Sequence, residues 1–415
     1  MTLPSRPLRL GFIALSDCAP LAVAQEKGFF GLEGLNVELS REASWANIRD
    51  KVAMAALDGA HMLGPLPIAA RLGLSGEPSA MIAPMSLNLN GSAITVSTAL
   101  AEAMRNADPQ AMDARPRTAR ALASVIAQRR EAGAAMLTFA VVFPFSVHNY
   151  QLRYWMAEAG IDPDRDVRIT VVPPARMTAR IASGDIDGFC VGAPWNAQAV
   201  ADGHGEIVIY AAEFWSVGPD KVFSVTEGWA AREPQALQSL LRALIQAAAW
   251  ADEPGNRAEL ASILAHQRYV DAPIETVARS LVGSPPYSRE EPGADSRDYI
   301  IYHRYAASFP WRSHAVWFLT QMLRWGQIGP DVDIAAAAEA AYRPDLYRAA
   351  AASLGEPAPI VDEKVEGLHT GPWTLDEASS PIAMAPDLFF DARRFDAAQP
   401  QRYAASFDIG RFRED

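Results

Sequence analysis

The sequence predicts an α/β protein with two lobes, and three observations lead to that fold class. The chain has 415 residues, which is enough for two or three domains of ordinary size. Half of the residues are hydrophobic and 21% are charged, so a large buried core is expected. Over the first two thirds of the chain, short apolar runs alternate with helical patterns, which is typical of βα units built on a parallel sheet.

A first cluster of these units occupies residues 1–96. Apolar runs or alternating patterns predict four strands there, over residues 8–13, 35–39, 61–63 and 93–97. Helices are expected over residues 19–30, after the N-cap Ser44, and after Gly64 and Pro65. The polar, turn-rich stretch 88–92 is expected to lead into the last strand.

A second cluster follows over residues 97–205. Its strands are predicted over residues 135–143, 167–172 and 188–191. Its helices are predicted over residues 99–133, 151–159 and 176–183. Gly184 suits the C-terminal end of the third of these helices.

After a strand over residues 207–210 the pattern changes to amphipathic helix, and the last sixty residues have little periodicity. We therefore expect four segments: 1–96 as the first part of lobe 1, 97–205 as lobe 2, 206–350 as a mostly helical return to lobe 1, and 351–415 as an irregular C-terminal wrap. Hinge strands would join the lobes. Ligands of open α/β sheets bind beyond the carboxyl ends of the strands, so this organisation predicts a cleft between the lobes.

Charge and cysteine content exclude several classes of function. The net charge is -12, whereas nucleic-acid binding requires a basic surface. The two cysteines, Cys18 and Cys190, are too few for a disulfide framework or a multi-thiolate metal site, and the seven histidines lack metal-ligand spacing. No metal and no cofactor are therefore expected.

The N-terminal region predicts where the protein acts. The apolar stretch at residues 10–15 is too short for the hydrophobic part of a secretory signal, which spans about 7–15 residues, and it is interrupted. No window of about 18 apolar residues predicts a transmembrane helix. A cytoplasmic protein is expected.

Four predicted turns place a helix N-terminus just after a strand, at residues 44–45, 64–65, 146–148 and 192–195. Free backbone N–H groups and the positive end of a helix dipole favour an anion at such places, although every α/β protein has such turns. His148 lies at one of them and could donate to an anion or simply pack in the core. Lys221 could neutralise an anion or lie solvated beside Asp220, and Trp45 could wall a pocket or fill the core.

No motif of a known enzyme class is present. The sequence contains no Gly-x-Ser-x-Gly nucleophile elbow, no P-loop, no dinucleotide-binding fingerprint after a strand, and no His-Glu-x-x-His metal motif. We therefore expect a binding protein and no enzyme.

Six segments spread over nearly the whole chain form a specific combination: 45–51 (WANIRDK), 87–91 (LNLNG), 152–155 (LRYW), 188–196 (GFCVGAPWN), 313–319 (SHAVWFL) and 324–326 (RWG). Together they resemble the nitrate- and bicarbonate-binding proteins of ABC uptake systems. The resemblance implies a type II periplasmic-binding-protein fold, in which two lobes close on a small oxyanion.

The resemblance also implies the ligand-binding residues. The nitrate-binding members surround the anion with a tryptophan, a glutamine, a histidine, a glycine amide and a lysine. The matching positions of this chain are Trp45, Ser92, His148, Gly192 and Lys221. Ser92 departs from the glutamine that is usual after Asn-Gly, and Val147 replaces the usual threonine before the histidine, so the contacts of the anion at both positions are open.

The lysine indicates which anion is bound. Nitrate only accepts hydrogen bonds and requires donors on all sides, whereas bicarbonate carries an O–H and benefits from an acceptor. The bicarbonate-binding members resemble this chain but use an acidic residue and a metal near the lysine position. Lys221 therefore favours nitrate or nitrite, and the neighbouring Asp220 leaves bicarbonate open.

Since a cytoplasmic location is expected, the chain is similar to the cytoplasmic members of this family, which resemble NasS-type nitrate/nitrite sensors. Such a sensor, when free of ligand, sequesters a NasT-like antiterminator with an RNA-binding ANTAR domain, and anion binding releases it to induce the genes of nitrate assimilation. The acidic surface suits a basic partner. One alternative is the substrate-binding component of an ABC uptake system for nitrate, nitrite or bicarbonate. Another is an enzyme on the same fold, such as the pyrimidine-precursor synthases of thiamine, but the cysteine-rich iron motif of that branch is absent.

Overall fold

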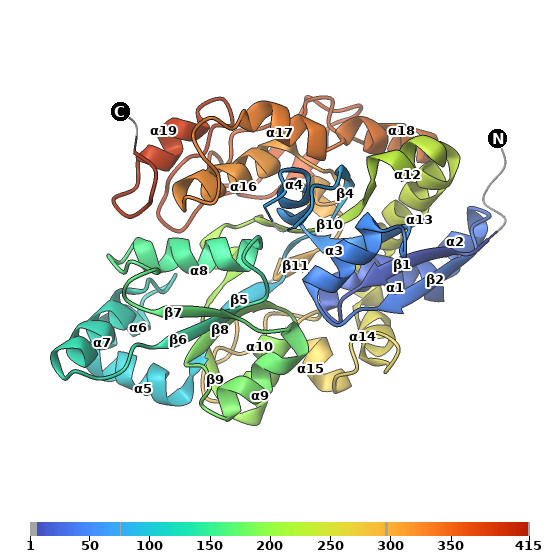
Figure 1. Cartoon of the computed structure of the whole chain (residues 1–415). Coiled ribbons are helices and arrows are strands. Elements are labelled where there is room, and N and C mark those ends of the chain that lie inside the picture. The colour runs from blue at the N-terminus through green and yellow to red at the C-terminus, as the bar shows by residue number, and fades with distance from the viewer. Residues whose placement is uncertain (1–5, 75, 295–297, 414–415) are drawn as a thin grey trace.

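Two β-sheets organise the protein. The computed structural model describes residues 6–74, 76–294 and 298–413. The first sheet runs in the order β11 (Ile300–Ile301), β4 (Met81–Asn90), β10 (Pro219–Thr226), β3 (Gly59–Leu63), β1 (Leu8–Phe12) and β2 (Val37–Arg41). The second runs in the order β7 (Arg168–Val171), β6 (Thr138–Val141), β8 (Gly188–Gly192), β5 (Ser92–Ser97) and β9 (Gly205–Tyr210). Each sheet with its helices forms one lobe, called lobe 1 and lobe 2 below (Figure 1).

Both sheets are mixed. In lobe 1, β2, β1 and β3 are parallel, whereas β10 pairs antiparallel with both β3 and β4. In lobe 2, β7, β6 and β8 are parallel, and β5 pairs antiparallel with β8 and β9. The predicted βα units therefore form the parallel part of each sheet, and the strands that cross between lobes form the antiparallel part.

The chain passes between the lobes near Gly91 and again between β9 and β10. Strand β4 ends at Asn90 and β5 begins at Ser92, so Gly91, with φ of 86°, is the one residue between them. The predicted lobe boundaries lay a few residues away, because residues 92–96 and 206–210 belong to the sheet of lobe 2. The turn predicted over residues 88–92 was wrong for its first half, because residues 88–90 complete the buried strand β4.

The helices of lobe 1 include the 3₁₀ helix η1 (Ser16–Cys18) and the α-helices α1 (Ala19–Glu26), α2 (Phe29–Leu32), α3 (Trp45–Ala53) and α4 (Leu66–Arg71). The helix predicted over residues 19–30 is split, because Gly28 has φ of 77° and interrupts it. Helix α3 begins where predicted: the side chain of its N-cap Ser44 accepts a hydrogen bond from the backbone N–H of Asn47.

Lobe 2 carries its own helices. They are α5 (Thr98–Ala107), α6 (Pro109–Asp113), α7 (Arg120–Glu131), α8 (Val147–Ala157), the 3₁₀ helix η2 (Pro174–Arg176), α9 (Met177–Ala182) and α10 (Trp195–Asp202). Helix α8 begins four residues before the start predicted for it, because the side chain of Ser146 caps its N-terminus. His148 therefore lies in the first turn of the helix, in agreement with the helix N-terminus predicted at residues 146–148.

The return to lobe 1 is mostly helical. Its elements are α11 (Ala211–Phe214), α12 (Glu227–Arg232), α13 (Pro234–Asp252), η3 (Pro254–Asn256), α14 (Arg257–Ala265), α15 (Ile274–Arg279), η4 (Arg304–Ala306), α16 (Arg312–Arg324), α17 (Ile334–Ala341) and α18 (Pro344–Leu354). Helix α13 packs against α1 and α18, and every residue of α16 after Arg312 is buried. Within the described part of the chain, no helix combines the length and the apolar character that crossing a membrane requires.

The C-terminal segment, residues 355–413, contains only short elements: β12 (Trp373–Leu375), β13 (Ile382–Met384) and α19 (Pro400–Ala405). It contacts lobe 2 through α8, where the Tyr154 hydroxyl donates to Asp391 over 2.8 Å. Arg411 forms an ion pair with Asp162 in the loop after α8, over 2.7 Å. The segment therefore lies against both lobes, along one side of the molecule (Figure 1).

Candidate functional site

A completely buried lysine lies at the centre of the site. Lys221 is on β10, between β3 and β4 of lobe 1, and its side chain is 0% exposed. Its Nζ lies 2.8 Å from Asp17 Oδ2 and 2.6 Å from Asp220 Oδ2. The pairing of β10 with β4 is irregular on both sides of Lys221. Successive side chains of a regular strand point to opposite faces of the sheet, so this irregularity is consistent with Asp220 and Lys221 contributing to the same cluster.

Asp17 contacts both Lys221 and a buried histidine, His61. It lies in η1, directly after β1, and its Oδ1 is 2.8 Å from His61 Nε2 on β3. The Trp45 ring meets the His61 ring edge-on at 5.2 Å between centroids, and Lys221 Nζ is 5.8 Å from the centre of the Trp45 ring. Four elements of lobe 1, namely η1, β3, α3 and β10, thus contribute to the cluster.

Lobe 2 closes the cluster from the opposite side. A Cβ atom built on Gly192, at the end of β8, would lie 3.0 Å from Asp17 Oδ2 and 3.7 Å from Lys221 Nζ. His148, in the first turn of α8, is 0% exposed and places Nε2 3.9 Å from Asp220 Oδ1. The backbone N–H of Ser16 donates to the Ala193 carbonyl over 2.8 Å and ties the two lobes together beside the site.

Ser92 takes a different position from the other predicted residues. It pairs with Gly192 in the register of β5 and β8, and its hydroxyl donates to Gln151 Oε1 over 3.2 Å. The structure therefore gathers Trp45, His148, Gly192 and Lys221 in one cluster, whereas Ser92 lies at its edge and contacts a glutamine of α8. The role of all five residues in binding remains a prediction.

Three residues of the cluster were not selected from the sequence. Asp17 was not considered, and His61 was grouped with scattered histidines. Asp220 was considered as a solvated neighbour of Lys221 and as a reason to leave bicarbonate open, but not as a site residue. That solvated alternative was wrong, because Asp220 is 2% and Lys221 0% exposed. One signal could have found Asp17: it lies four residues after the first predicted strand, at the edge of the sheet where ligands bind.

Burial and the neighbouring charges set the ionisation of the cluster. Burial by itself would raise the pKa of Asp17, but attraction to Lys221 and His61 holds that pKa well below its usual value. Burial raises the pKa of Asp220 to about 7 against the attraction of Lys221, and repulsion from Asp17 adds to the rise. Burial would lower the pKa of Lys221, but the two carboxylates raise it, so the ammonium stays charged.

The two histidines are neutral at neutral pH. Burial lowers the pKa of His61, although Asp17 opposes the change. Burial lowers the pKa of His148 well below its usual value, and repulsion from Lys221 adds to the effect. Each neutral ring carries one N–H donor and one acceptor nitrogen.

Several buried polar atoms of this region have no hydrogen-bond partner among the described residues. They are Ser16 Oγ, Trp45 Nε1, Asn88 Oδ1, both ring nitrogens of His148, Asp220 Oδ1 and the Tyr299 hydroxyl. Buried polar groups are nearly always hydrogen-bonded in native proteins, so a collection around one ammonium indicates a site built for a small polar ligand. Within residues 6–74, 76–294 and 298–413, no group of three or more His, Cys, Asp and Glu side chains could hold a metal ion.

A cleft of about 790 Å³ lies between the lobes and borders this cluster. Its lobe 1 wall includes Ile13, Ala14 and Ser44, next to the site residues Asp17 and Trp45. Its lobe 2 wall includes Trp195, whose indole N–H donates to the Ala14 carbonyl over 3.1 Å and bridges the lobes.

Three exposed arginines line the cleft. Arg41 pairs loosely with Asp271, at 3.6 Å, and Arg180 pairs with Asp185, at 2.6 Å. Arg176, at the end of η2, has no ion-pair partner in the described ranges. The cleft is also lined by Glu42 and Asp271, so its lining carries one excess positive charge, which favours the approach of an anion to a chain whose net charge is -12.

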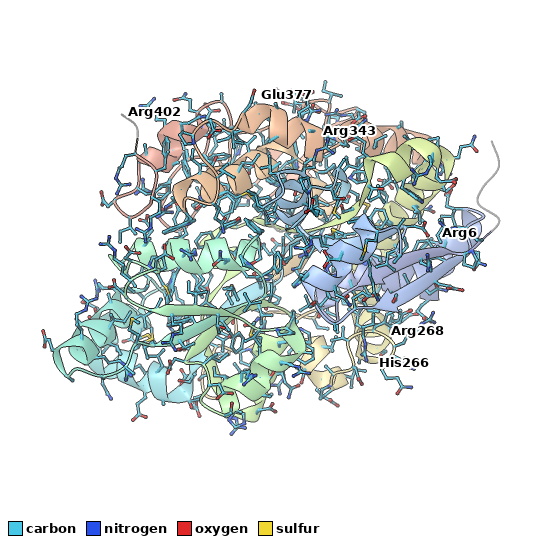
Figure 2. The ribbon with its side chains drawn as sticks, viewed as in Figure 1. Arg6, His266, Arg268, Arg343, Glu377 and Arg402 are labelled. Carbon is cyan, nitrogen blue, oxygen red and sulfur yellow. The ribbon has the colours of Figure 1, made fainter. Side chains whose placement is uncertain are left out.

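Replacing Arg176 by glutamate is expected to slow anion association about two- to tenfold at low salt, because it reverses a charge at the cleft mouth. The dissociation rate is expected to stay unchanged, and about 0.5 M salt should remove most of the difference by screening. Stopped-flow measurements of tryptophan fluorescence with nitrate would give both rates. Arg402→Glu is the control: it makes the same charge change on the surface helix α19, outside the lining of the cleft (Figure 2). A change in dissociation alone would contradict the steering role.

Comparison with known proteins gives the family context of this geometry. The chain matches the NMT1-like family over residues 2–265. It is 34% identical over 403 residues to the nitrate/nitrite binding protein NrtA of Synechococcus elongatus, covering 95% of this chain and 84% of that protein. It is 28% identical to the bicarbonate-binding protein CmpA of the same species, covering 98% of this chain and 87% of that protein.

Solved structures agree with this relationship. The crystal structure of the periplasmic nitrate-binding protein NrtA from Synechocystis PCC 6803 is similar, with a TM-score of 0.86, 31% identity, and coverage of 98% of this chain and 100% of that chain. A zinc-bound ligand-binding component of an ABC-type import system from Staphylococcus aureus has a TM-score of 0.64 at 13% identity, covering 83% of this chain and 99% of that chain, and so shares the fold alone. The predicted two-lobed periplasmic-binding-protein fold is confirmed.

Proposed function

Since the chain belongs to the NMT1-like family, and within it to the nitrate- and bicarbonate-binding substrate-binding proteins of ABC uptake systems, we propose that it binds nitrate or nitrite between its two lobes. The ligand would occupy the buried cluster around Lys221. The relatives named above are binding proteins by their names, and the proposed role is likewise binding without catalysis.

One observation carries the choice of ligand. The only full positive charge of the cluster at neutral pH is the ammonium of Lys221, and unpaired N–H donors of Trp45 and neutral His148 lie around it in the described structure. An oxyanion that accepts hydrogen bonds from several sides suits such donors. The carboxylates Asp17 and Asp220 would also accept the O–H of bicarbonate, which keeps bicarbonate as the alternative ligand.

The role that the family supports best is the substrate-binding component of an ABC uptake system. A cytoplasmic NasS-type sensor that sequesters a NasT-like ANTAR antiterminator is the second candidate. The observation in its favour is the net charge of -12, which complements a partner that binds RNA through basic residues. Cell fractionation separates the roles: a periplasmic pool supports uptake, and a cytoplasmic pool that releases an ANTAR protein on addition of nitrate supports sensing.

Isothermal titration of the purified protein with nitrate, nitrite, bicarbonate and sulfate tests the proposed ligand. Binding of nitrate or nitrite at roughly micromolar Kd, about -8 kcal/mol, with no response to sulfate, is the expected result. Tight binding of bicarbonate alone would replace nitrate by bicarbonate as the ligand. A chain that binds none of the four anions would contradict the proposed function.

A further inference from the structure

The charge of Lys221 is already balanced before any anion arrives. Its Nζ contacts two carboxylates at 2.8 and 2.6 Å, from Asp17 and Asp220, and all three side chains are at most 2% exposed. Asp17 and Lys221 together carry no net charge, and the histidines beside them are neutral at neutral pH. An anion that entered unaccompanied would therefore leave uncompensated negative charge in a buried site, which is strongly unfavourable.

Asp220 is the group that can relieve this excess. Its Oδ1 has no hydrogen-bond partner in the described structure and lies 3.9 Å from His148 Nε2, whose ring nitrogens also lack partners. A proton on Asp220 would remove one negative charge and turn an acceptor oxygen into an O–H donor that faces the ligand. Asp17 accepts a proton less easily, since one of its oxygens contacts Lys221 and the other contacts His61.

We propose that the protein takes up its oxyanion together with one proton from solvent, and that Asp220 holds this proton beside the bound anion. This inference rests on the proposed function, because it concerns the same ligand and the same site. In the binding step, one anion and one H⁺ enter, the carboxylate of Asp220 becomes a carboxylic acid, and no covalent bond to the anion forms or breaks.

All titratable groups that face Asp220 are compatible with this assignment. They are Lys221 on its own strand, Asp17 in η1, His148 on α8, Cys190 on β8 and Tyr299 before β11. Burial raises the pKa of Cys190 and Tyr299, so both are already neutral and cannot accept the proton. Lys221 is already protonated, because its pKa is raised. His148 takes up a proton less readily than Asp220, because burial and repulsion from Lys221 lower the pKa of its ring. Asp17 also takes one up less readily, because attraction to Lys221 and His61 holds its pKa low.

The pKa of Asp220 in the ligand-free protein determines the pH range in which proton uptake can be measured. Burial raises the pKa of Asp220 to about 7, so the carboxyl is mostly protonated at about pH 6 and mostly ionised at about pH 8.5. An anion next to Asp220 raises that pKa further. Proton uptake per anion bound should therefore be small at about pH 6 and approach one at about pH 8.5, and binding should weaken up to about tenfold per pH unit above about 7.

The experiment is titration calorimetry of the full chain with sodium nitrate and sodium nitrite at about pH 6 and pH 8.5, each in two buffers of different ionisation heat. The difference between buffers gives the number of protons taken up per anion. Neither anion takes up a proton itself in this range, so any uptake belongs to the protein. Uptake near one at the higher pH is the expected result.

A neutral replacement assigns the proton. Asp220→Asn keeps the shape of the side chain without the titration, so it is expected to remove the proton uptake and to bind nitrate at least tenfold more tightly than the wild type at about pH 8.5. Asp113→Asn, at the exposed end of α6 and outside the cleft lining, makes the same change at a distant position as a control and should keep the wild-type uptake.

Three outcomes would overturn the inference, in distinguishable ways. Nitrate binding by the wild type without proton uptake at about pH 8.5 would refute it and leave the proposed function standing, whether or not the variant folds. Uptake that persists in a folded Asp220→Asn variant would place the proton elsewhere and refute the assignment to Asp220. Absence of nitrate and nitrite binding at both pH values would refute the proposed function and the inference with it.

Discussion

Replacing Lys221 by methionine is expected to weaken nitrate binding about 30- to 5,000-fold and to lower the free energy of unfolding by about 3–5 kcal/mol. The methionine side chain fills a similar volume but carries no charge, so the carboxylate of Asp17 keeps only His61 as a partner. The anion would lose its one full positive charge, which should cost about 2–5 kcal/mol of binding free energy. Titration calorimetry and urea unfolding measure the two effects.

Two further variants separate lost binding from lost folding. Lys27→Met removes a lysine whose ion pair with Glu259 is at the surface, and it should change the stability by about 0–1 kcal/mol and leave nitrate binding intact. In Lys221→Met, the buried Asp220 carboxyl loses the attraction of the ammonium and has to take up a proton, and the double variant Lys221→Met with Asp220→Asn removes this requirement. It should regain stability relative to Lys221→Met without regaining nitrate binding. A Lys221→Met protein that binds nitrate as tightly as the wild type would refute the central role of this lysine.

Replacing Gly192 by valine is expected to weaken nitrate binding about 10- to 100-fold, because the added side chain pushes the two lobes apart. Its Cβ would meet Asp17 Oδ2 at 3.0 Å and Leu15 Cδ2 at 3.5 Å, both of which belong to lobe 1. Such overpacking typically costs about 1–3 kcal/mol, and here the cost falls on the closed arrangement that surrounds the anion. Titration with nitrate gives the Kd of this variant.

The same substitution at an open position gives the control. A Cβ on Gly371 would have no neighbouring atom within 4 Å, so Gly371→Val should leave the affinity for nitrate unchanged. Gly192→Ala should fall between wild type and Gly192→Val, since a single methyl group can be accommodated by a small shift. Equal affinities in wild type and Gly192→Val would show that the lobes need not approach this closely to hold the anion.

Local sequence patterns predicted most of the fold, because the buried face of each strand and helix in the βα units shows as apolar residues at regular spacing. Strand β1 and the capped start of α3 were found in this way. Strand β4 was missed because all ten of its residues are buried, polar Asn88 and Asn90 included, so it shows no alternation. The split of the predicted first helix at Gly28 depends on one left-handed residue, which the apolar pattern does not reveal.

The site was only partly predictable for a different reason. The resemblance to a known family supplied Trp45, His148, Gly192 and Lys221 as candidates, and the structure brings these four together. The partners of Lys221 could not be inferred from spacing, because Asp17 lies 204 residues away in the chain. Asp220 is the nearest neighbour in sequence, yet its full burial follows from packing between two lobes, which only the tertiary structure determines.

The position of β10 has a consequence for the order in which the protein is made. Strands β3 and β4 follow one another in the chain but do not pair, because β10 lies between them. A ribosome must therefore synthesise all of lobe 2 before the strand that joins the two halves of the first sheet emerges. Until then, β3 has one unpaired edge and β4 has two, because its other partner β11 follows even later in the chain. Unpaired edges favour aggregation, whereas residues 92–210 already contain every strand of their own sheet. Since this late strand also carries Lys221, we expect the binding site to be absent from the nascent chain until its two halves are joined.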